Sequence, residues 1–306
     1  MLLHIETPLL ESSAMAGPDG PALWLKMEAL QPTGSFKNRG VGFACAEYQR
    51  RGARRFICSS GGNAGIAAAY AGRRLGVPVL VVVPETTSER ARTLIRREQA
   101  ELIVHGASFQ EANELALSMV TPHDAFIHPF DDPLLWTGHA SLIDEVAQAG
   151  LRPDAVLLSV GGGGLLCGVL EGLRRNGWDD TAVIAVETEG AASLAAALDA
   201  GERVVLPAIT SIATSLGARQ VSQQAFEQAR RHAVRSVVVP DRAAVAACLR
   251  FMDDHRLVVE PACGAALAVA YDALNALAGQ RTVLVIVCGG ATASVAQLQQ
   301  WGAQQQ

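Results

Sequence analysis

Residues 155–175 read AVLLSVGGGGLLCGVLEGLRR, which is an apolar strand, four glycines in a row and the start of a helix. Continuous apolar runs of this kind are typical of strands buried inside a parallel sheet. Glycine has no Cβ, so the loop backbone can bring its N–H groups close to a ligand. The helix N-terminus adds unpaired N–H donors and a partial positive charge. The stretch therefore predicts an α/β fold with an anion site, best suited to a phosphate, at Gly161, Gly162, Gly163 and Gly164.

Length and composition set the broad class of the protein. The chain has 306 residues, and half of them are hydrophobic. This length exceeds that of one ordinary domain, so we expect two lobes. The net charge is −5 and no basic stripe occurs, so we expect no nucleic-acid partner. No apolar run of about 20 residues is present and the N-terminus lacks a basic segment, so we expect neither a membrane span nor a signal peptide.

The cysteines and histidines bear on the cellular location of the protein and on metal binding. None of the six cysteines forms a CxxC pair, which is typical of reduced thiols in the cytoplasm. The seven histidines form neither HxxxH nor HExxH, which disfavours a zinc site.

Strand and helix patterns alternate from about residue 33 to residue 132, which predicts a doubly wound unit. We expect a small α/β domain at 33–132 and a large domain formed by 1–32 and 133–306, two doubly wound lobes in all. Asp131, Asp132 and Pro133 interrupt the pattern, and 201–220 is expected to be irregular. The expected strands are 23–28, 55–58, 79–83, 101–104, 155–160, 182–187, 236–239 and 283–288. The expected helices are 35–50 with Ser35 as N-cap, a segment ending near 75, 88–97, 109–120, 138–149 and 165–175.

The common nucleotide signatures do not fit the glycine loop. The dinucleotide pattern G-x-G-x-x-G/A requires a small residue where this chain has Leu166 or Cys167. The Walker sequence G-x-x-x-x-G-K-[ST] is absent, and so is the G-x-S-x-G elbow of α/β-hydrolases. The loop therefore indicates a phosphate ligand of another kind.

Lys37 stands out because the chain has only two lysines, Lys26 and Lys37, among 25 basic residues. Lys37 falls in the first turn of an expected helix, where the macrodipole disfavours its charge. A neutral lysine amine can form a Schiff base, which an arginine cannot. A solvated surface lysine is the ordinary alternative, and the scarcity of lysine weakens it.

A Schiff-base lysine and a phosphate loop together point to pyridoxal phosphate, which carries an aldehyde and a phosphate. The loop 59–65 opens a second helix N-terminus that can hold a carboxylate, helped by the Ser60 hydroxyl. Asn63 could donate to the ring oxygen of the cofactor or could be a simple N-cap. Cys288, at the end of an apolar strand, could be a core thiol or could face the pocket.

These residues resemble the serine/threonine dehydratase family, which are fold type II pyridoxal-phosphate enzymes with a tryptophan synthase β-like fold. The similarity is greatest to the compact L-serine dehydratases and the serine dehydratase-like proteins, and it runs from Thr7 to Leu298. Six blocks in one order carry it: QPTGSFKNRG, CSSGGNAG, FDDPLLWTGHAS, SVGGGGLLCGV, VEPACGAAL and VIVCGG.

The resemblance implies a role for each site residue. Lys37 would form the Schiff base and act as the catalytic base, and Phe36 would lie against the cofactor ring. Asn63 would bond the ring oxygen, and Cys288 would face the ring nitrogen. The remaining roles fall to groups of residues: the phosphate to Gly161, Gly162, Gly163, Gly164 and Leu165, and the substrate carboxylate to Ser60, Gly61 and Asn63. The family's monovalent cation, usually potassium, would be held by Gly161, Glu187, Ala191, Ser193, Leu216 and Ala218.

Two positions depart from the family pattern. Gly61 stands where one branch of the family has alanine and another has glycine, and loss of the methyl group would loosen the substrate face. Ser215 stands where an alanine is expected behind the ring.

The activity that the resemblance implies is L-serine ammonia-lyase, with L-threonine as a second substrate. A β-replacement enzyme, such as a cysteine or threonine synthase, is the alternative within the fold. A non-catalytic ligand-binding protein is the alternative from another class. The chain ends soon after Cys288, so no regulatory domain is expected and the role is catabolic. The family also implies a homodimer.

Overall fold

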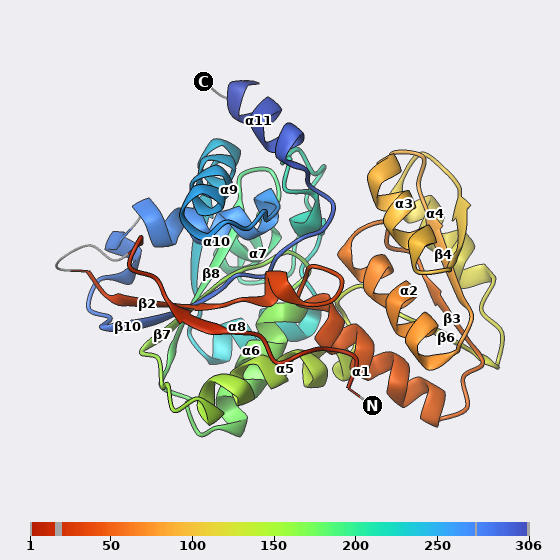
Figure 1. Ribbon diagram of the computed structural model, residues 1–306, viewed down its shortest axis with the longest axis horizontal. Helices are drawn as coiled ribbons and strands as arrows, with labels where there is room; N and C mark the ends of the chain where they lie inside the picture. Colours follow the sequence, from red (N-terminus) through yellow and green to blue (C-terminus); the bar gives the residue numbers. More distant parts are fainter. Residues whose placement is uncertain (1, 16–19, 273, 305–306) are drawn as a thin grey trace.

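The computed structural model describes residues 2–15, 20–272 and 274–304, which form two lobes side by side (Figure 1). Strands of the described residues make two sheets, one in each lobe. The large sheet has the order β1-β2-β10-β7-β8-β9 and the small sheet the order β5-β4-β3-β6. All neighbouring strands are parallel except β1 and β2, so the expected α/β fold is confirmed.

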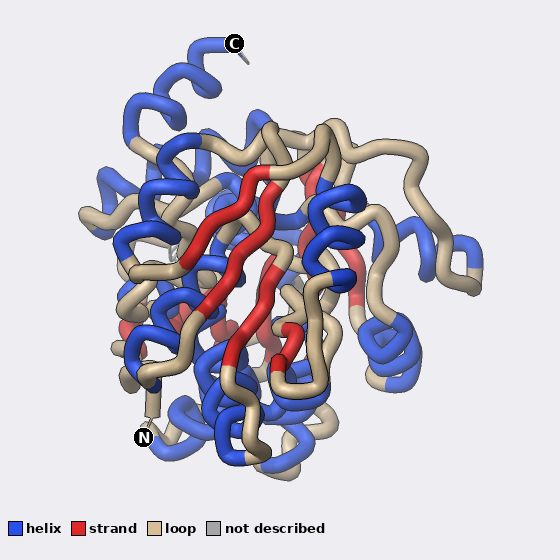
Figure 2. The backbone as a smooth tube through the Cα atoms, turned by 90° about the vertical axis from the view of Figure 1, so that its right-hand side faces the viewer, coloured by secondary structure: helices blue, strands red, loops and turns tan. Residues whose placement is uncertain are grey.

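The small sheet is built from short apolar strands, each followed by a helix or a loop. Figure 2 turns this lobe toward the viewer and shows its four strands with helices against them. Its strands are β3 (Arg55–Cys58), β4 (Val79–Val83), β5 (Glu101–Val104) and β6 (Asp124–Phe126), and its helices are α2 (Asn63–Leu75), α3 (Glu89–Arg97) and α4 (Phe109–Ser118).

The large sheet combines the N-terminal segment with the second half of the chain. Its strands are β1 (Leu9–Glu11), β2 (Ala22–Lys26), β7 (Ala155–Ser159), β8 (Ala182–Thr188), β9 (Arg235–Val239) and β10 (Thr282–Ile286). The remaining α-helices are α1 (Lys37–Arg50), α5 (Pro133–Gln148), α6 (Gly164–Arg175), α7 (Ser193–Ala200), α8 (Gln223–Arg231), α9 (Asp241–His255), α10 (Pro261–Asp272) and α11 (Val295–Gln304). Of these, α1 packs buried side chains into the core of the small lobe. Short 3-10 turns lie at η1 (Glu28–Leu30), η2 (Thr214–Leu216) and η3 (Leu274–Leu277). The division at 33–132 remains a prediction.

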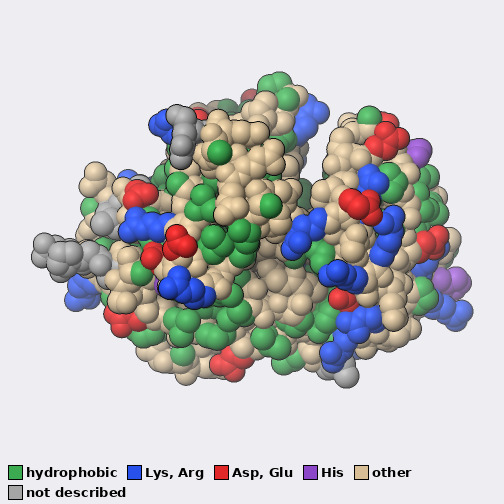
Figure 3. Space-filling model, turned by 45° about the horizontal axis from the view of Figure 1, so that its top comes forward, with side chains coloured by type: hydrophobic (Ala, Val, Ile, Leu, Met, Phe, Trp, Pro, Cys, Tyr) green, Lys and Arg blue, Asp and Glu red, His purple; other side chains and the backbone are tan. Residues whose placement is uncertain are grey.

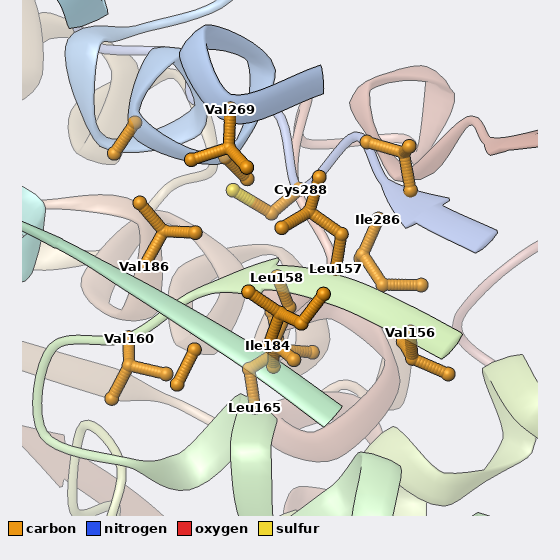
Figure 4. Packing of buried hydrophobic residues seen from close by; sticks show 14 of the residues in the cluster. Val156, Leu157, Leu158, Val160, Leu165, Ile184, Val186, Val269, Ile286 and Cys288 are labelled. Carbon is orange, nitrogen blue, oxygen red and sulfur yellow. The ribbon is translucent and has the colours of Figure 1, made fainter. Parts of the chain in front are cut away.

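The core of the large lobe forms around β7, whose five residues are all buried. Val156, Leu157 and Leu158 pack with side chains of β8, β10 and α10, and Cys288 belongs to the same cluster (Figure 4). Burial on both faces explains why this strand is an unbroken apolar run.

Helix α1 approaches α5 through two glycines. A Cβ on Gly138 would lie 2.7 Å from the Cα of Gly40, and one on Gly40 would lie 2.5 Å from Cε1 of His139. Only residues without a side chain allow backbones this close. The crossing fixes the start of α1, and therefore Lys37, between the lobes.

Two sequence expectations about helix starts are wrong. Helix α5 begins at Pro133 rather than at 138, because Asp132 accepts a hydrogen bond from the N–H of Leu134 at 2.8 Å and proline suits the first helical position. Ser35 is not the N-cap of α1; the cap is Phe36, and the buried Ser35 hydroxyl has no partner among the described residues. Strands β1 and β6 were not predicted, because three residues are too few to show a period.

No helix within the described ranges has the length and apolar character needed to cross a membrane.

Candidate active site

Three loops that follow strand carboxyl ends meet between the lobes, where Figure 3 shows the surface hollowed. Residues 59–62 follow β3, residues 160–163 follow β7, and residues 287–290 follow β10. Ligands of parallel α/β sheets bind at such edges. The two sheets therefore present their loops to one common site.

The segment before α1 is bonded to the segment after β10. Phe36 donates its N–H to the carbonyl of Cys288 at 3.1 Å, and Gly290 donates to the carbonyl of Gly34 at 2.8 Å. Ser35 and Gly289 form an isolated antiparallel bridge between these two bonds. This pairing places the Lys37 backbone next to Cys288, although 251 positions separate them in the sequence.

Lys37 is a half-buried lysine with no carboxylate partner among the described residues. Its Nζ donates to the carbonyl oxygen of Pro129 at 2.5 Å and lies 5.0 Å from the centre of the Phe36 ring. Burial lowers the pKa of Lys37 to about 8, against a weaker opposing effect of Cys58, Cys288 and Glu260. A pKa this low makes a neutral, nucleophilic amine accessible near neutral pH.

Pro129 and its neighbour Phe130 connect Lys37 to the glycine loop. A Cβ on Gly162 would lie 2.4 Å from the Phe130 ring, and one on Gly164 would lie 2.7 Å from the Phe130 carbonyl oxygen. Trp136 donates its indole N–H to that same carbonyl at 2.9 Å and holds it in place. The structure thus brings Lys37 and the glycine loop together.

The glycine loop has the backbone shape expected of an anion site. Gly163 adopts a φ of 97° as the N-cap of α6, a conformation that other residues rarely adopt. Among the described residues, the N–H groups of Gly161 to Gly164 donate to no protein acceptor. Free N–H donors at a helix N-terminus suit a phosphate.

Asn63 joins the two lobes through its side-chain amide. Its Nδ2 donates to Oε1 of Glu260 at 2.8 Å, and its Oδ1 accepts from the N–H of Ala291 at 3.0 Å. A carboxylate accepts only and an N–H donates only, so these partners fix which end of the amide is which. The N-cap of α2 is Gly62, so the alternative in which Asn63 is a simple N-cap is wrong.

Glu260 is a buried carboxylate that the sequence analysis did not single out. Besides Asn63, it accepts a hydrogen bond from the Thr292 hydroxyl at 2.8 Å. Burial raises the pKa of Glu260, while hydrogen bonds from Ser215, Thr292 and Asn63 act in the opposite direction. Ser215, which departs from the family pattern, also lies 3.4 Å from the Asn63 amide nitrogen.

His139 is a buried, neutral histidine that packs against Phe36 and the start of α1. Its Nδ1 accepts the N–H of Gly40 at 3.1 Å, which leaves the proton on Nε2. Burial lowers the pKa of His139 well below its usual range, with a further contribution from Lys37. Its ring centre is 4.8 Å from that of Phe36. A neutral ring here supports Phe36 without adding a second positive charge.

Cys288 is a buried thiol at the edge of the large-lobe core. A hydrogen bond with Cys263, followed by burial, raises the pKa of the Cys288 thiol well above its usual value. The thiol therefore stays protonated at neutral pH. All six cysteines are free and buried.

The candidate cation residues form two neighbouring groups. Glu187 accepts from the N–H groups of Leu194 and Ala195 at 2.8 and 2.7 Å, and the buried Ser193 hydroxyl nearby has no partner among the described residues. Burial raises the pKa of Glu187 to about 7, despite the two backbone hydrogen bonds. Gly161 lies against Leu216, since a Cβ on Gly161 would lie 2.8 Å from the Leu216 Cα. Among the described residues, no three His, Cys, Asp or Glu side chains gather as a metal site.

Comparison with known proteins identifies the family. The model of the pyridoxal-phosphate dependent enzyme family matches residues 1–289. The chain belongs to this family. It is 47% identical to the human L-serine dehydratase/L-threonine deaminase, over 97% of this chain and 94% of that protein. It is 48% identical to the mouse serine dehydratase-like protein, over 97% and 93%. The crystal structure of a fungal L-serine ammonia-lyase from Rhizomucor miehei matches with a TM-score of 0.93 at 36% identity, over 99% of both chains.

The resemblance predicted from the sequence blocks is therefore confirmed, as is the fold type II architecture. The residues of this pyridoxal-phosphate family member also fit the cofactor. Within the part of the chain that the structure describes, the site offers an amine without a carboxylate partner at Lys37, unpaired N–H groups at the glycine loop and an oriented amide at Asn63. These features match an aldehyde, a phosphate and a ring oxygen, respectively.

The sequence suggested that Gly61 loosens the substrate face, but the structure shows no open space at this position. A Cβ on Gly61 would lie 2.6 Å from Oγ1 of Thr87 and 2.7 Å from its Cγ2. The volume of the missing methyl group is already occupied. Neighbouring Ser60 accepts a hydrogen bond from the N–H of Gly62 at 3.3 Å.

Proposed function

We propose that the protein is an L-serine ammonia-lyase that converts L-serine into pyruvate and ammonia, and that it also converts L-threonine into 2-oxobutyrate. The observation that carries the proposal is Lys37, an amine without a carboxylate in ion-pair contact among the described residues. It is connected to the glycine loop through the segment of Pro129 and Phe130, and its backbone lies beside the segment after β10 that bonds Asn63. The names of the human, mouse and fungal relatives support serine and threonine as substrates.

The roles of the cofactor-binding residues follow from what each group can donate. Pyridoxal phosphate, when bound, supplies an aldehyde that links to amines and a ring that accepts electrons. Lys37 would link to it, and the N–H groups of Gly161 to Gly164 and of Leu165 would bind its phosphate. Phe36 would cover one face of the ring, and the second N–H of the Asn63 amide would reach the ring oxygen. The protonated Cys288 thiol would face the ring nitrogen.

The substrate would be bound by its carboxylate and activated at its α-carbon. The N–H groups and hydroxyl of the Ser60–Asn63 loop lie at the N-terminus of α2, which favours an anion. After the substrate amine takes the place of Lys37 in the link to the cofactor, the freed, neutral Lys37 amine would remove the α-proton of the substrate. Its low pKa suits it to hold and return that proton near neutral pH. Loss of the β-hydroxyl as water, then hydrolysis, gives the keto acid and ammonia.

Three further features extend the proposal. Glu187, Ser193 and the carbonyl groups of Gly161, Ala191, Leu216 and Ala218 would hold a potassium ion, whose charge would favour the carboxylate form of Glu187. The six free cysteines fit a cytoplasmic location. Homodimerisation is proposed from the family resemblance. A rise of Tm on adding potassium chloride, absent in Glu187→Gln, tests the cation site.

The activity is tested with purified protein, pyridoxal phosphate and L-serine as the only amino acid. Pyruvate release is the expected result, and 2-oxobutyrate is expected from L-threonine. Product that forms only when a second nucleophile is added would favour β-replacement. Cofactor binding without product in any condition would favour a ligand-binding protein.

A further inference from the structure

The loop after β4 forms a wall beside the loop that is proposed to bind the substrate carboxylate. Strands β3 and β4 are parallel neighbours, so the segments that follow them, 59–62 and 84–88, emerge at the same edge of the small sheet. Thr87 is half-buried in the second segment and is held by a hydrogen bond from its N–H to the carbonyl of Pro84 at 3.0 Å.

The side chain of Thr87 fills the space that a side chain on Gly61 would take. Both branches of the threonine, Oγ1 and Cγ2, lie within 2.7 Å of the Cβ position of Gly61, and the threonine Cβ is 3.3 Å away. The φ of Gly61 lies outside the left-handed region, so its backbone tolerates other residues. The requirement for glycine at 61 therefore comes from Thr87 and not from the backbone.

Helix α3, which follows this loop, reaches the segment after β10. Arg90 donates from its Nε to the carbonyl of Ala291 at 3.0 Å, and the N–H of Ala291 donates to Asn63. The segment that starts at Thr87 thus closes onto the backbone that orients Asn63. A substrate on the Ser60–Asn63 loop would meet Thr87 on one side.

We propose that Thr87 is a specificity-determining residue that lines the amino-acid subsite, and that positions 61 and 87 form one coupled steric pair. The proposal rests on the amino-acid lyase function proposed above. Thr87 limits the room for the substrate beside its carboxylate, so a smaller residue at 87 admits the extra methyl group of L-threonine. A methyl group added at 61 without a change at 87 forces the two loops apart.

The test is a double-mutant cycle of Gly61→Ala and Thr87→Ala in the holoenzyme, with kcat and KM measured for L-serine and L-threonine. Thr87→Ala is expected to raise the threonine-to-serine ratio of kcat/KM about tenfold, the lower end of the range for one methylene group in a pocket. Gly61→Ala is expected to lower kcat/KM for L-serine about tenfold, and the double variant to recover most of this loss. Thr87→Val, which keeps the shape and removes the hydroxyl, should keep the wild-type ratio.

Tm, measured with and without pyridoxal phosphate, reports the steric conflict between positions 61 and 87 independently of turnover. Gly61→Ala should lower Tm by about 3 °C, and the double variant should restore it. Gly62→Ala is the matched control for Tm, because its Cβ would meet only the Ser60 hydroxyl, at 3.9 Å. Additive effects in both cycles, or an unchanged substrate ratio in Thr87→Ala, would overturn the proposal. A wild-type enzyme that forms no keto acid contradicts the lyase function, and the Tm cycle still decides the steric pair.

Discussion

The two lysines of the chain occupy contrasting surroundings. Lys26, at the end of β2, donates to Oε2 of Glu145 at 2.5 Å and to the carbonyl of Thr7 at 2.7 Å. Glu145 and Glu28 also pair with the fully buried Arg39. Two cations and two carboxylates thus balance one another in the interior of the protein.

Lys37 lies one short segment further along and has no such balance. Its amine donates to the neutral carbonyl of Pro129 and has no carboxylate in ion-pair contact among the described residues. Burial lowers its pKa more than Glu260 and the nearby thiols raise it. Burial alone therefore does not make a lysine reactive. A buried lysine paired with a carboxylate serves the structure, because removing its partner would leave an uncompensated charge. A buried lysine without a carboxylate loses its proton more easily and can attack a carbonyl group.

Removal of each amine in turn should separate the two lysines by the largest effect. Lys37→Ala should lower L-serine turnover about a thousandfold or more, because the group that links the cofactor and moves the α-proton is lost. Lys26→Met should keep the cofactor linkage, since Arg39 still accompanies Glu145. Pyruvate formation measures both. Turnover of Lys37→Ala within tenfold of the wild type would contradict the assignment.

Removal of the shared carboxylate tests the structural lysine. Glu145→Ala leaves Lys26 without a carboxylate partner among the described residues and Arg39 with Glu28, and should cost about 3 to 5 kcal/mol of unfolding free energy. Urea unfolding measures this loss. Asp180→Ala removes the carboxylate of an exposed pair with Arg152 and should cause no resolvable change. Equal losses of unfolding free energy in the two variants would show that the buried cluster contributes no more to stability than an exposed ion pair.

Glu260 provides a smaller, conformational test of the reactive region. In Glu260→Gln only one oxygen can accept, so either Asn63 or Thr292 faces an amide N–H instead of an acceptor. We expect kcat/KM for L-serine to fall about tenfold, as for loss of one charged hydrogen bond. Thr292→Val, which removes only one donor to Glu260, should have a milder effect. Wild-type kinetics in Glu260→Gln would mean that the Asn63 orientation does not depend on Glu260.

The lowered pKa of Lys37 also predicts how the stability of the cofactor-free protein depends on pH. The pKa of Lys37 is about 8 in the folded protein and 10.5 in the reference state, so the folded protein binds fewer protons between these values. Stability should therefore rise with pH from about 8 to 10.5 through this group, and Lys37→Met should remove that contribution. Urea midpoints across this interval measure it, and identical profiles for both proteins would exclude a depressed pKa.

Local features of this fold were predictable from the sequence, and contacts across the chain were not. The glycine loop, the strand before it and Lys37 depend on neighbours within a few residues, and each was predicted. Glu260 bonds Asn63 across 197 positions, and Thr87 meets Gly61 from the next strand's loop. The blocks VEPACGAAL and FDDPLLWTGHAS contain Glu260, Phe130 and His139, but no local pattern indicates what these side chains contact. The predicted start of helix α5 at 138 is too late, because Asp-Pro marks a helix start as well as a break.

The most direct test of the difference between the two lysines is borohydride reduction of the enzyme with bound pyridoxal phosphate, followed by peptide mass spectrometry. Reduction fixes the cofactor covalently on whichever amine holds it. We expect the label on Lys37 and unmodified Lys26. A label on Lys26, or a cofactor that stays bound with neither lysine labelled, would contradict the account.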